Sequence, residues 1–231
     1  MGSRTRPWST AGGPGELPGG PLIFAAADGM GGHLDGAQAS KIAVQRLAEI
    51  VQGRTVNIEQ LNAALEPAGQ GHHDLGDVDT LSRPGTTVAG LALTEQDGEV
   101  CWLAFHVGDS RIYRWSEADG LEQIGSDHSV VQALVDAGAI TEERALTHPQ
   151  RRMITKAPGF GDRGGADYTF LPVVPGDRFL MCSDGLTGEL LDGRIAVMTT
   201  DADEQALAEQ LVAEAVQLGA QDNVSVVVAQ V

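Results

Sequence analysis

Cysteine and aromatic residues are scarce in this sequence. Its 231 residues include two cysteines, Cys101 and Cys182, and aromatic residues make up 4% of the chain. Both cysteines lie in apolar runs without the spacing of a CxxC or Cys/His site, so we expect buried thiols in a reducing compartment rather than a disulfide. The three tryptophans fall in a tail, a core strand and a sheet face, which predicts no aromatic platform for stacking bases (Trp8, Trp102 and Trp115).

Positive charge is also scarce. Fifteen Lys and Arg residues stand against 32 Asp and Glu residues, which gives a formal net charge of −17. A chain this acidic gains nothing from releasing the counterions of nucleic acid, and anionic lipid repels it. We therefore expect neither nucleic acid nor a membrane as a partner. A phosphorylated substrate would need cations at its binding site to offset this negative field.

Long apolar runs are absent as well. No stretch approaches the roughly 20 apolar residues that a membrane span needs. The N-terminus has no apolar segment typical of a signal peptide, and Arg6 stands where N-myristoylation requires Ser or Thr. These absences predict a cytoplasmic protein. Because no apolar surface stripe is left over for an interface, we favour a monomer.

The chain divides into a short segment and a long one. Residues 1–20 are rich in Gly, Pro and Ser, which predicts a flexible N-terminal segment. Residues 21–231 show no further linker and no internal repeat, which predicts a single domain. Periodicity predicts a first helix that starts near Asp35 with a capping box to Gln38, and further helices at about 58–66, within 128–160 and over 203–218.

Strand patterns fill most of the remainder. They cover 86–94, 99–107, 110–115, 121–124, 168–174 and 178–183, with a last strand that ends at Val231. Asp97-Gly98 and Asp119-Gly120 predict hairpin turns between them. The run Val100–Val107 is almost entirely apolar, so we expect that strand to be buried on both faces. The fold class is therefore α+β, with two stacked antiparallel sheets flanked by helices in an αββα sandwich.

Asp-Gly dipeptides occur six times, and most of them predict turns. Asp28 and Asp184 differ because each directly follows an apolar strand, and Asp109 and Asp222 also lie at strand ends. Four carboxylates at four strand ends suit a hard divalent cation such as Mg²⁺ or Mn²⁺, which prefers oxygen ligands. The alternative is a set of solvated loop acids, since sequence separation does not show whether the four converge. Asp192, in a polar stretch, is predicted to lie in a loop.

Several motifs carry a family resemblance. They occur in this order: Ala27-Asp28-Gly29-Met30-Gly31-Gly32-His33, Gly85-Thr86-Thr87, Gly108-Asp109-Ser110-Arg111, Ser183-Asp184-Gly185 and Asp222-Asn223. In order and rough spacing, the chain resembles the metal-dependent serine/threonine protein phosphatases of type 2C, the PPM family, and in particular the small stand-alone bacterial members. The segment from Ser126-Asp127-His128 to His148-Pro149-Gln150-Arg151 is similar to the flap of those members. The resemblance covers residues 21–231 and implies one catalytic domain with a flap subdomain at about 126–160.

The resemblance also implies a metal centre. Asp28 would bridge two metal ions, Mn²⁺ or Mg²⁺, and Gly29 would offer its backbone carbonyl. Asp184 and Asp222 would complete the shell of the first ion. Asp109, together with Asp184, would hold a third ion.

The implied reaction is hydrolysis of phosphoserine and phosphothreonine in proteins by a metal-activated water. Asp28 would be catalytic through the metal ions, and His33 would act as a general acid or beside the metals. No covalent phosphoenzyme is implied, so Cys182 and Ser183 are not expected to be nucleophiles. The implied partners are a phosphoprotein substrate and a serine/threonine kinase or its targets.

One departure from the family pattern keeps alternatives open. The family begins with a strand that carries an Arg and then Asn-Glu-Asp, whereas residues 1–20 here contain no Asn and a single acid, Glu16. Arg6 or Arg4 would then have to bind the substrate phosphate. One alternative is a phosphatase-like module that binds phosphoproteins with weak or no turnover, and another is a hydrolase of small phosphoesters. Two further residues are interpreted structurally, His106 as a satisfied core residue and Arg111 as half of an ion pair.

Overall fold

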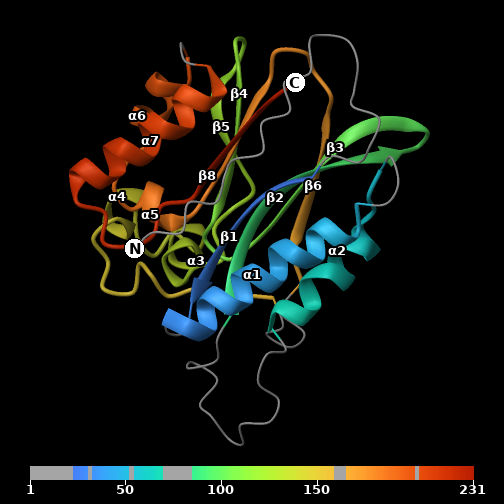
Figure 1. Cartoon of the computed structure of the whole chain (residues 1–231). Coiled ribbons are helices and arrows are strands. Elements are labelled where there is room, and N and C mark those ends of the chain that lie inside the picture. The colour runs from blue at the N-terminus through green and yellow to red at the C-terminus, as the bar shows by residue number, and fades with distance from the viewer. Residues whose placement is uncertain (1–22, 31–32, 52–54, 70–84, 159–164, 201–202) are drawn as a thin grey trace, which may run out of the picture.

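Two four-stranded antiparallel sheets form the centre of the molecule. The computed structural model describes residues 23–30, 33–51, 55–69, 85–158, 165–200 and 203–231. Within these residues the strand orders are β1-β2-β3-β6 and β5-β4-β7-β8 (Figure 1). The strands are β1 (Ile23–Met30), β2 (Gly85–Gln96), β3 (Glu99–Val107), β4 (Arg111–Ser116), β5 (Gly120–Ile124), β6 (Asp167–Pro172), β7 (Arg178–Cys182) and β8 (Val226–Gln230).

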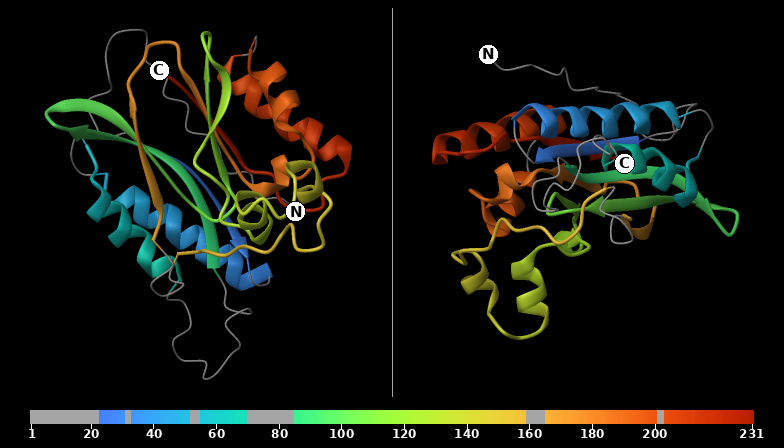
Figure 2. Two further views of the ribbon diagram at one scale, coloured as in Figure 1. Left: turned by 180° about the vertical axis from the view of Figure 1, so that it is seen from behind. Right: turned by 90° about the horizontal axis from the view of Figure 1, so that it is seen from below.

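Helices cover both outer faces of the paired sheets. On the first sheet lie α1 (His33–Glu49), α2 (Ile58–Leu65) and the 3₁₀ turn η1 (Glu66–Gly69). On the second lie α5 (Asp184–Thr187), α6 (Asp192–Thr199) and α7 (Glu204–Leu218). The helices α3 (Val130–Asp136) and α4 (Glu142–Ala145) belong to the flap, which projects from the sandwich in the second view of Figure 2. In the described part of the chain, no helix is both long and apolar enough to span a membrane.

Three apolar layers hold the sandwich together. Between the sheets, Leu91, Trp102, Phe179 and Met181 are buried in one cluster. A second cluster packs α1 and α2 on the first sheet, and a third packs α5, α6 and α7 on the second. The predicted αββα sandwich is therefore confirmed, since each sheet has one face toward the other sheet and one toward helices.

Strand β3 shows how the sequence specifies these layers. Alternate residues of β3 join different clusters, with Trp102 between the sheets and Leu103 and Phe105 beneath the helices. The predicted burial on both faces is confirmed from Trp102 to Val107, while Val100 near the hairpin is exposed. At that hairpin, Asp97 and Gly98 both adopt positive φ, as a tight two-residue turn requires.

Three of the differences from the sequence-based expectations lie in α1, α6 and α7. Helix α1 begins at His33, so Asp35 lies inside the helix and not at its start. There Gly36 packs so closely on Gly29 that a Cβ on Gly29 would lie 2.0 Å from the Gly36 carbonyl oxygen. This tertiary contact fixes the first turn of α1 and outweighs the local capping signal.

The other two differences lie on the second sheet's helical face. Asp192 begins α6 rather than a loop, and Ile195 and Thr199 are the buried residues of that helix. With so few buried positions, α6 carries little periodicity in its sequence, and its packing decides the structure. Leu218, which helical spacing from Leu207, Leu211 and Ala215 predicts to be on the same face of the helix, is 56% exposed because α7 ends there at Gly219.

Candidate metal centre

The antiparallel pairing places Asp28 and Asp109 at the same end of the first sheet. Asp28 lies near the end of β1 and pairs with Thr87, near the start of β2. Strand β3 ends at Val107, which pairs with Val88, so Asp109 follows β3 at this same end. The hydroxyl groups of Thr87 and Ser110 are 2.6 Å apart and tie the start of β2 to the residue after Asp109.

The second sheet contributes Asp184 and Asp222 in the same way. Cys182, the last residue of β7, pairs with Val226, the first residue of β8. Asp184 therefore comes just after one strand and Asp222 just before its neighbour, at one end of the sheet. Antiparallel neighbours bring such residues together even though they lie far apart in the sequence.

Ser183 joins these two segments through hydrogen bonds. Its Oγ donates a hydrogen bond to the carbonyl of Asn223 at 3.1 Å and accepts one from the N–H of Ser225 at 3.0 Å. Although Ser183 is the N-cap residue of α5, its side chain makes no capping bond to that helix. A Cβ on Gly185 would lie 2.3 Å from the Asn223 carbonyl oxygen, so the two segments are in close contact. The Ser183 hydroxyl therefore holds the segment that carries Asp222 in place instead of capping α5.

The four carboxylates of the two sheets act on one another. Burial, followed by the charges of Asp184 and Asp222, raises the pKa of Asp28 to about 7, and the charge of Asp109 adds to this. Burial and the charge of Asp184 raise the pKa of Asp109 to about 7. Burial and the charge of Asp222 raise the pKa of Asp184. The strand-end aspartates predicted from the sequence therefore lie close enough to interact by charge, and we refer to these four residues as the aspartate cluster.

Two basic side chains of the described residues partly offset this cluster. Arg111 lowers the pKa of Asp109 by its charge, but its guanidinium is bound to Asp127 with an Nη2 to Oδ2 distance of 2.7 Å. The predicted structural ion pair of Arg111 is thereby confirmed. Arg152, in the flap, lowers the pKa of Asp184 by its charge. Its side chain is exposed and makes no ion pair or hydrogen bond within the part of the chain that the structure describes.

The chemistry of this cluster fits a divalent cation. Four carboxylates offer only hard oxygen donors, which Mg²⁺ and Mn²⁺ prefer and which do not suit a soft, thiolate-bound ion. The raised pKa values of Asp28, Asp109 and Asp184 reflect first the burial of these carboxylates and then the repulsion between their charges. A bound cation would offset that repulsion.

Two of the predicted site residues are not placed by the structure. Arg6 lies outside the described residues. His33 begins α1, but its side chain is not described, so its predicted role stays a prediction. The buried thiol of Cys182, whose pKa burial raises to about 12, supports the expectation that it is no nucleophile.

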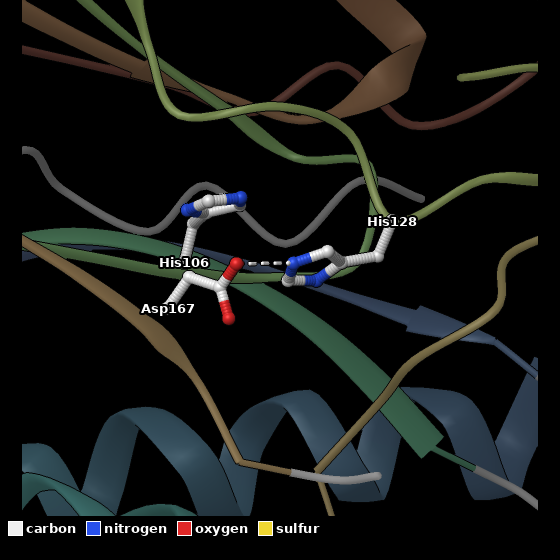
Figure 3. A group of neighbouring side chains, drawn as sticks. All are labelled: His106, His128 and Asp167. Carbon is white, nitrogen blue, oxygen red and sulfur yellow. Dashed lines mark hydrogen bonds and ion pairs between the residues drawn. The ribbon is translucent and has the colours of Figure 1, made fainter. Parts of the chain in front are cut away.

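A second polar group, which the sequence analysis did not identify, lies at the root of the flap. His106 of β3, His128 before α3 and Asp167 of β6 place ligand-type atoms within 4.8 Å of one another (Figure 3). The His106 Nε2–H donates to the Ser126 carbonyl at 2.9 Å, which confirms His106 as a satisfied core residue. His128 Nε2 bonds Asp167 at 3.0 Å, and Lys156 pairs with the same carboxylate.

This histidine group does not fit a metal ion. The two imidazole rings stack with centroids 4.7 Å apart and planes 17° from parallel. Since the lone pairs of an imidazole lie in the plane of its ring, two stacked rings cannot aim them at a shared point between them. Both nitrogens of His128 are also taken, Nδ1 by the N–H of Gly108 and Nε2 by Asp167. In the sequence, His106 was interpreted as a core residue and His128 belonged to the Ser126-Asp127-His128 motif of the flap, and neither pattern pointed to Asp167.

Comparison with known proteins adds a family to this geometry. The sequence profile of the family described as protein phosphatase 2C matches residues 13–221. Protein phosphatase PhpP of Streptococcus pneumoniae is 35% identical over 213 residues, which are 90% of this chain and 85% of PhpP. The expected resemblance is therefore confirmed at the level of sequence.

Solved structures of serine/threonine phosphatases are similar to this fold. The crystal structure of the Mycobacterium tuberculosis serine/threonine phosphatase PstP/Ppp matches with a TM-score of 0.77 and 32% identity, covering 90% of this chain and 88% of that one. The catalytic domain of PstP in complex with two manganese ions matches with a TM-score of 0.76 and 29% identity, over 90% and 86% of the two chains. With its αββα sandwich and its strand-end aspartates, the chain belongs to the protein phosphatase 2C family.

Proposed function

We propose that this protein is a metal-dependent phosphatase that hydrolyses phosphoserine and phosphothreonine in proteins. The observation that carries the proposal is the convergence of Asp28, Asp109, Asp184 and Asp222 between the two sheets. Relatives with this fold are named as serine/threonine protein phosphatases, which supports catalysis over a phosphoprotein-binding module without turnover.

The ions would be Mn²⁺ or Mg²⁺. Asp28, the carbonyl of Gly29, Asp184 and Asp222 would hold two of them, and Asp109 with Asp184 would hold a third. The donor set supports this assignment, and so does the manganese-bound structure of PstP. When bound, the ions would activate water for attack on phosphorus and offset the charge of the phosphate dianion.

Other residues of the chain would then orient the metal ligands and protonate the leaving group. Thr86 Oγ1 donates to the carbonyl of Asp28 at 2.8 Å, which fixes the backbone of a residue that would hold the ions. Ser183 keeps Asp222 beside Asp184 through its two hydrogen bonds. His33, the first residue of α1, would be the general acid that protonates the leaving serine or threonine oxygen.

The substrate phosphate needs a cation from the protein as well. Arg6 remains a candidate from the sequence. Arg152 is a second candidate, because its exposed side chain belongs to the flap, pairs with no acid among the described residues, and its charge reaches Asp184. The flap at about 126–160 would then control access to a single catalytic domain over 21–231. A serine/threonine kinase or its targets would be the partners, and we expect a cytoplasmic monomer.

Phosphate release tests this proposal and its competitor together. We expect turnover of a phosphothreonine peptide with Mn²⁺ that is lost in EDTA, and slower turnover of a small aryl phosphate at equal concentration. Faster turnover of the aryl phosphate than of the peptide would instead identify a hydrolase of small phosphoesters. No turnover of either, with tight Mn²⁺ binding by calorimetry, would identify the binding module.

A further inference from the structure

His128 forms two hydrogen bonds with the backbone of Gly108. The backbone N–H of His128 donates to the Gly108 carbonyl at 2.9 Å, and His128 Nδ1 accepts from the Gly108 N–H at 3.1 Å. Gly108 adopts a φ of +98°, and a Cβ there would lie 2.5 Å from Cγ2 of Thr87. Gly108 therefore has no room for a side chain, and the residue that follows it is Asp109.

The hydrogen bond from Gly108 also sets the tautomer of His128. Because Nδ1 accepts an N–H, the neutral ring carries its proton on Nε2, and burial lowers the pKa of His128 toward this neutral form. Nε2–H then donates to Asp167 Oδ2 at 3.0 Å. Lys156 pairs with the other carboxylate oxygen and keeps Asp167 ionised, with its pKa lowered to about 2.

Two more contacts hold the ring and join it to the flap. The His128 ring stacks on His106, which is 6% exposed and fixed to Ser126 (Figure 3). The carbonyl of His128 accepts a hydrogen bond from Thr155 N–H at 2.8 Å, in the segment where the flap returns to the sheets. His128 thus contacts both ends of the flap and the turn that precedes Asp109.

We propose that His128 is a positioning residue for Asp109, acting through Gly108, and that it couples the base of the flap to the metal site to which Asp109 contributes. The inference rests on the proposed metal centre. Its chemical basis is the pair of hydrogen bonds between His128 and the backbone of Gly108, which hold the residue directly before Asp109. His128 Nδ1 therefore binds the backbone before a proposed ligand, not the ion itself.

Two isosteric substitutions separate the two side-chain hydrogen bonds of His128, one to Gly108 and one to Asp167. His128→Asn keeps an oxygen where Nδ1 accepts from Gly108 but cannot reach Asp167. His128→Gln keeps a donor toward Asp167 but loses the acceptor for Gly108. By calorimetric titration with Mn²⁺, we expect His128→Gln to weaken binding on the order of tenfold, as changes next to metal ligands do, and His128→Asn to stay within about twofold of the wild type.

A double-mutant cycle with Asp109→Ala tests whether His128 affects Mn²⁺ binding through Asp109. In the Asp109→Ala background, His128→Gln should cause no further loss of Mn²⁺ affinity, because the ligand that it positions is gone. A full additional loss there, or equal losses in His128→Asn and His128→Gln, would overturn the inference.

Asp167→Ala is the matched control, since it removes the contacts of His128 Nε2 and Lys156 with β6 and leaves the hydrogen bonds between His128 and Gly108 in place. It should lower the unfolding temperature but leave Mn²⁺ affinity near the wild-type value. A loss of Mn²⁺ affinity in this variant would contradict a route through Gly108, even if His128→Gln fails to fold. Wild-type protein that binds no Mn²⁺ at all would instead refute the proposed metal centre.

Discussion

Asp28 and Asp184 lie close enough to interact by charge, although Asp28 is on β1 of the first sheet and Asp184 follows β7 of the second. After burial, the charge of Asp184 is the largest cause that raises the pKa of Asp28 to about 7. A divalent cation between the sheets would offset this repulsion.

The metal-free protein should therefore lose stability as the pH rises. Burial and neighbouring charge raise the pKa of both Asp28 and Asp109 from 3.8 to about 7. Both groups bind protons more tightly in the folded than in the unfolded chain, so their stabilising effect is complete below about pH 4 and is lost as the pH rises to about 7. In EDTA, we expect the unfolding temperature to fall by several degrees between about pH 5 and pH 8.

Saturating Mn²⁺ should restore the unfolding temperature at the higher pH, because the cation then compensates the ionised carboxylates. An unfolding temperature in EDTA that stays level or rises over this interval would show that the carboxylates do not repel one another as the structure indicates.

Asp222→Asn should remove turnover without removing the fold. Changes next to metal ligands already cost about 10- to 100-fold, so loss of a ligand should reduce metal-dependent turnover by at least that factor. The unfolding temperature in EDTA should stay level or rise, because the substitution removes one of the repelling charges. Asp97→Asn, in an exposed hairpin turn whose positive φ Asn also tolerates, is the control and should keep full activity. Wild-type turnover of Asp222→Asn under saturating Mn²⁺ would exclude Asp222 as a ligand.

Ser183→Ala should weaken metal binding rather than the chemical step. The substitution leaves the N–H of Ser225 without its acceptor and frees the segment that carries Asp222. We expect the Mn²⁺ concentration for half-maximal activity to rise on the order of tenfold, with the rate at saturating Mn²⁺ largely retained. Ser40→Ala, whose hydroxyl donates to the carbonyl of Ala37 within α1, serves as the matched control. If the saturated rate fell and the Mn²⁺ requirement did not change, Ser183 would have another role.

Arg152→Gln should affect the substrate more than the metal. Arg152 is an exposed cation whose charge reaches Asp184, so its loss should raise the KM for a phosphothreonine peptide by about threefold to tenfold and leave Mn²⁺ affinity within about twofold. Arg144→Gln, an exposed arginine elsewhere in the flap, tests whether any flap cation has this effect. An unchanged KM in Arg152→Gln, or an equal rise in Arg144→Gln, would leave Arg6 as the candidate for phosphate binding.

Part of the candidate site could be predicted because it depends on local pattern. A carboxylate directly after an apolar strand has few places to go, and this placement picked out Asp28 and Asp184 without any knowledge of the sheets. The contacts of His128 could not be predicted in this way. They join a turn after β3, the start of β6 and the flap return, and no short segment of sequence records that these three meet.

The same distinction between local pattern and long-range contact applies to the predicted helices and strands. Long elements with a clear period, such as β3 and α7, were predicted within a few residues of their ends. The short helices α5 and α6 were missed, because each buries only two residues and forms through packing on the second sheet. The start of α1 was misplaced for a related reason, since the close contact of Gly29 with Gly36 decides it.

One comparison tests most directly whether the strand-end aspartates bind the metal that drives hydrolysis. Mn²⁺ would be titrated by calorimetry into the wild type and into an Asp184→Asn/Asp222→Asn double variant, and phosphate release from a phosphothreonine peptide would be measured in the same samples. We expect the wild type to bind Mn²⁺ and to turn over the peptide, and the folded double variant to do neither. A double variant that binds Mn²⁺ with wild-type affinity and retains turnover would contradict the assignment of this cluster as the metal centre.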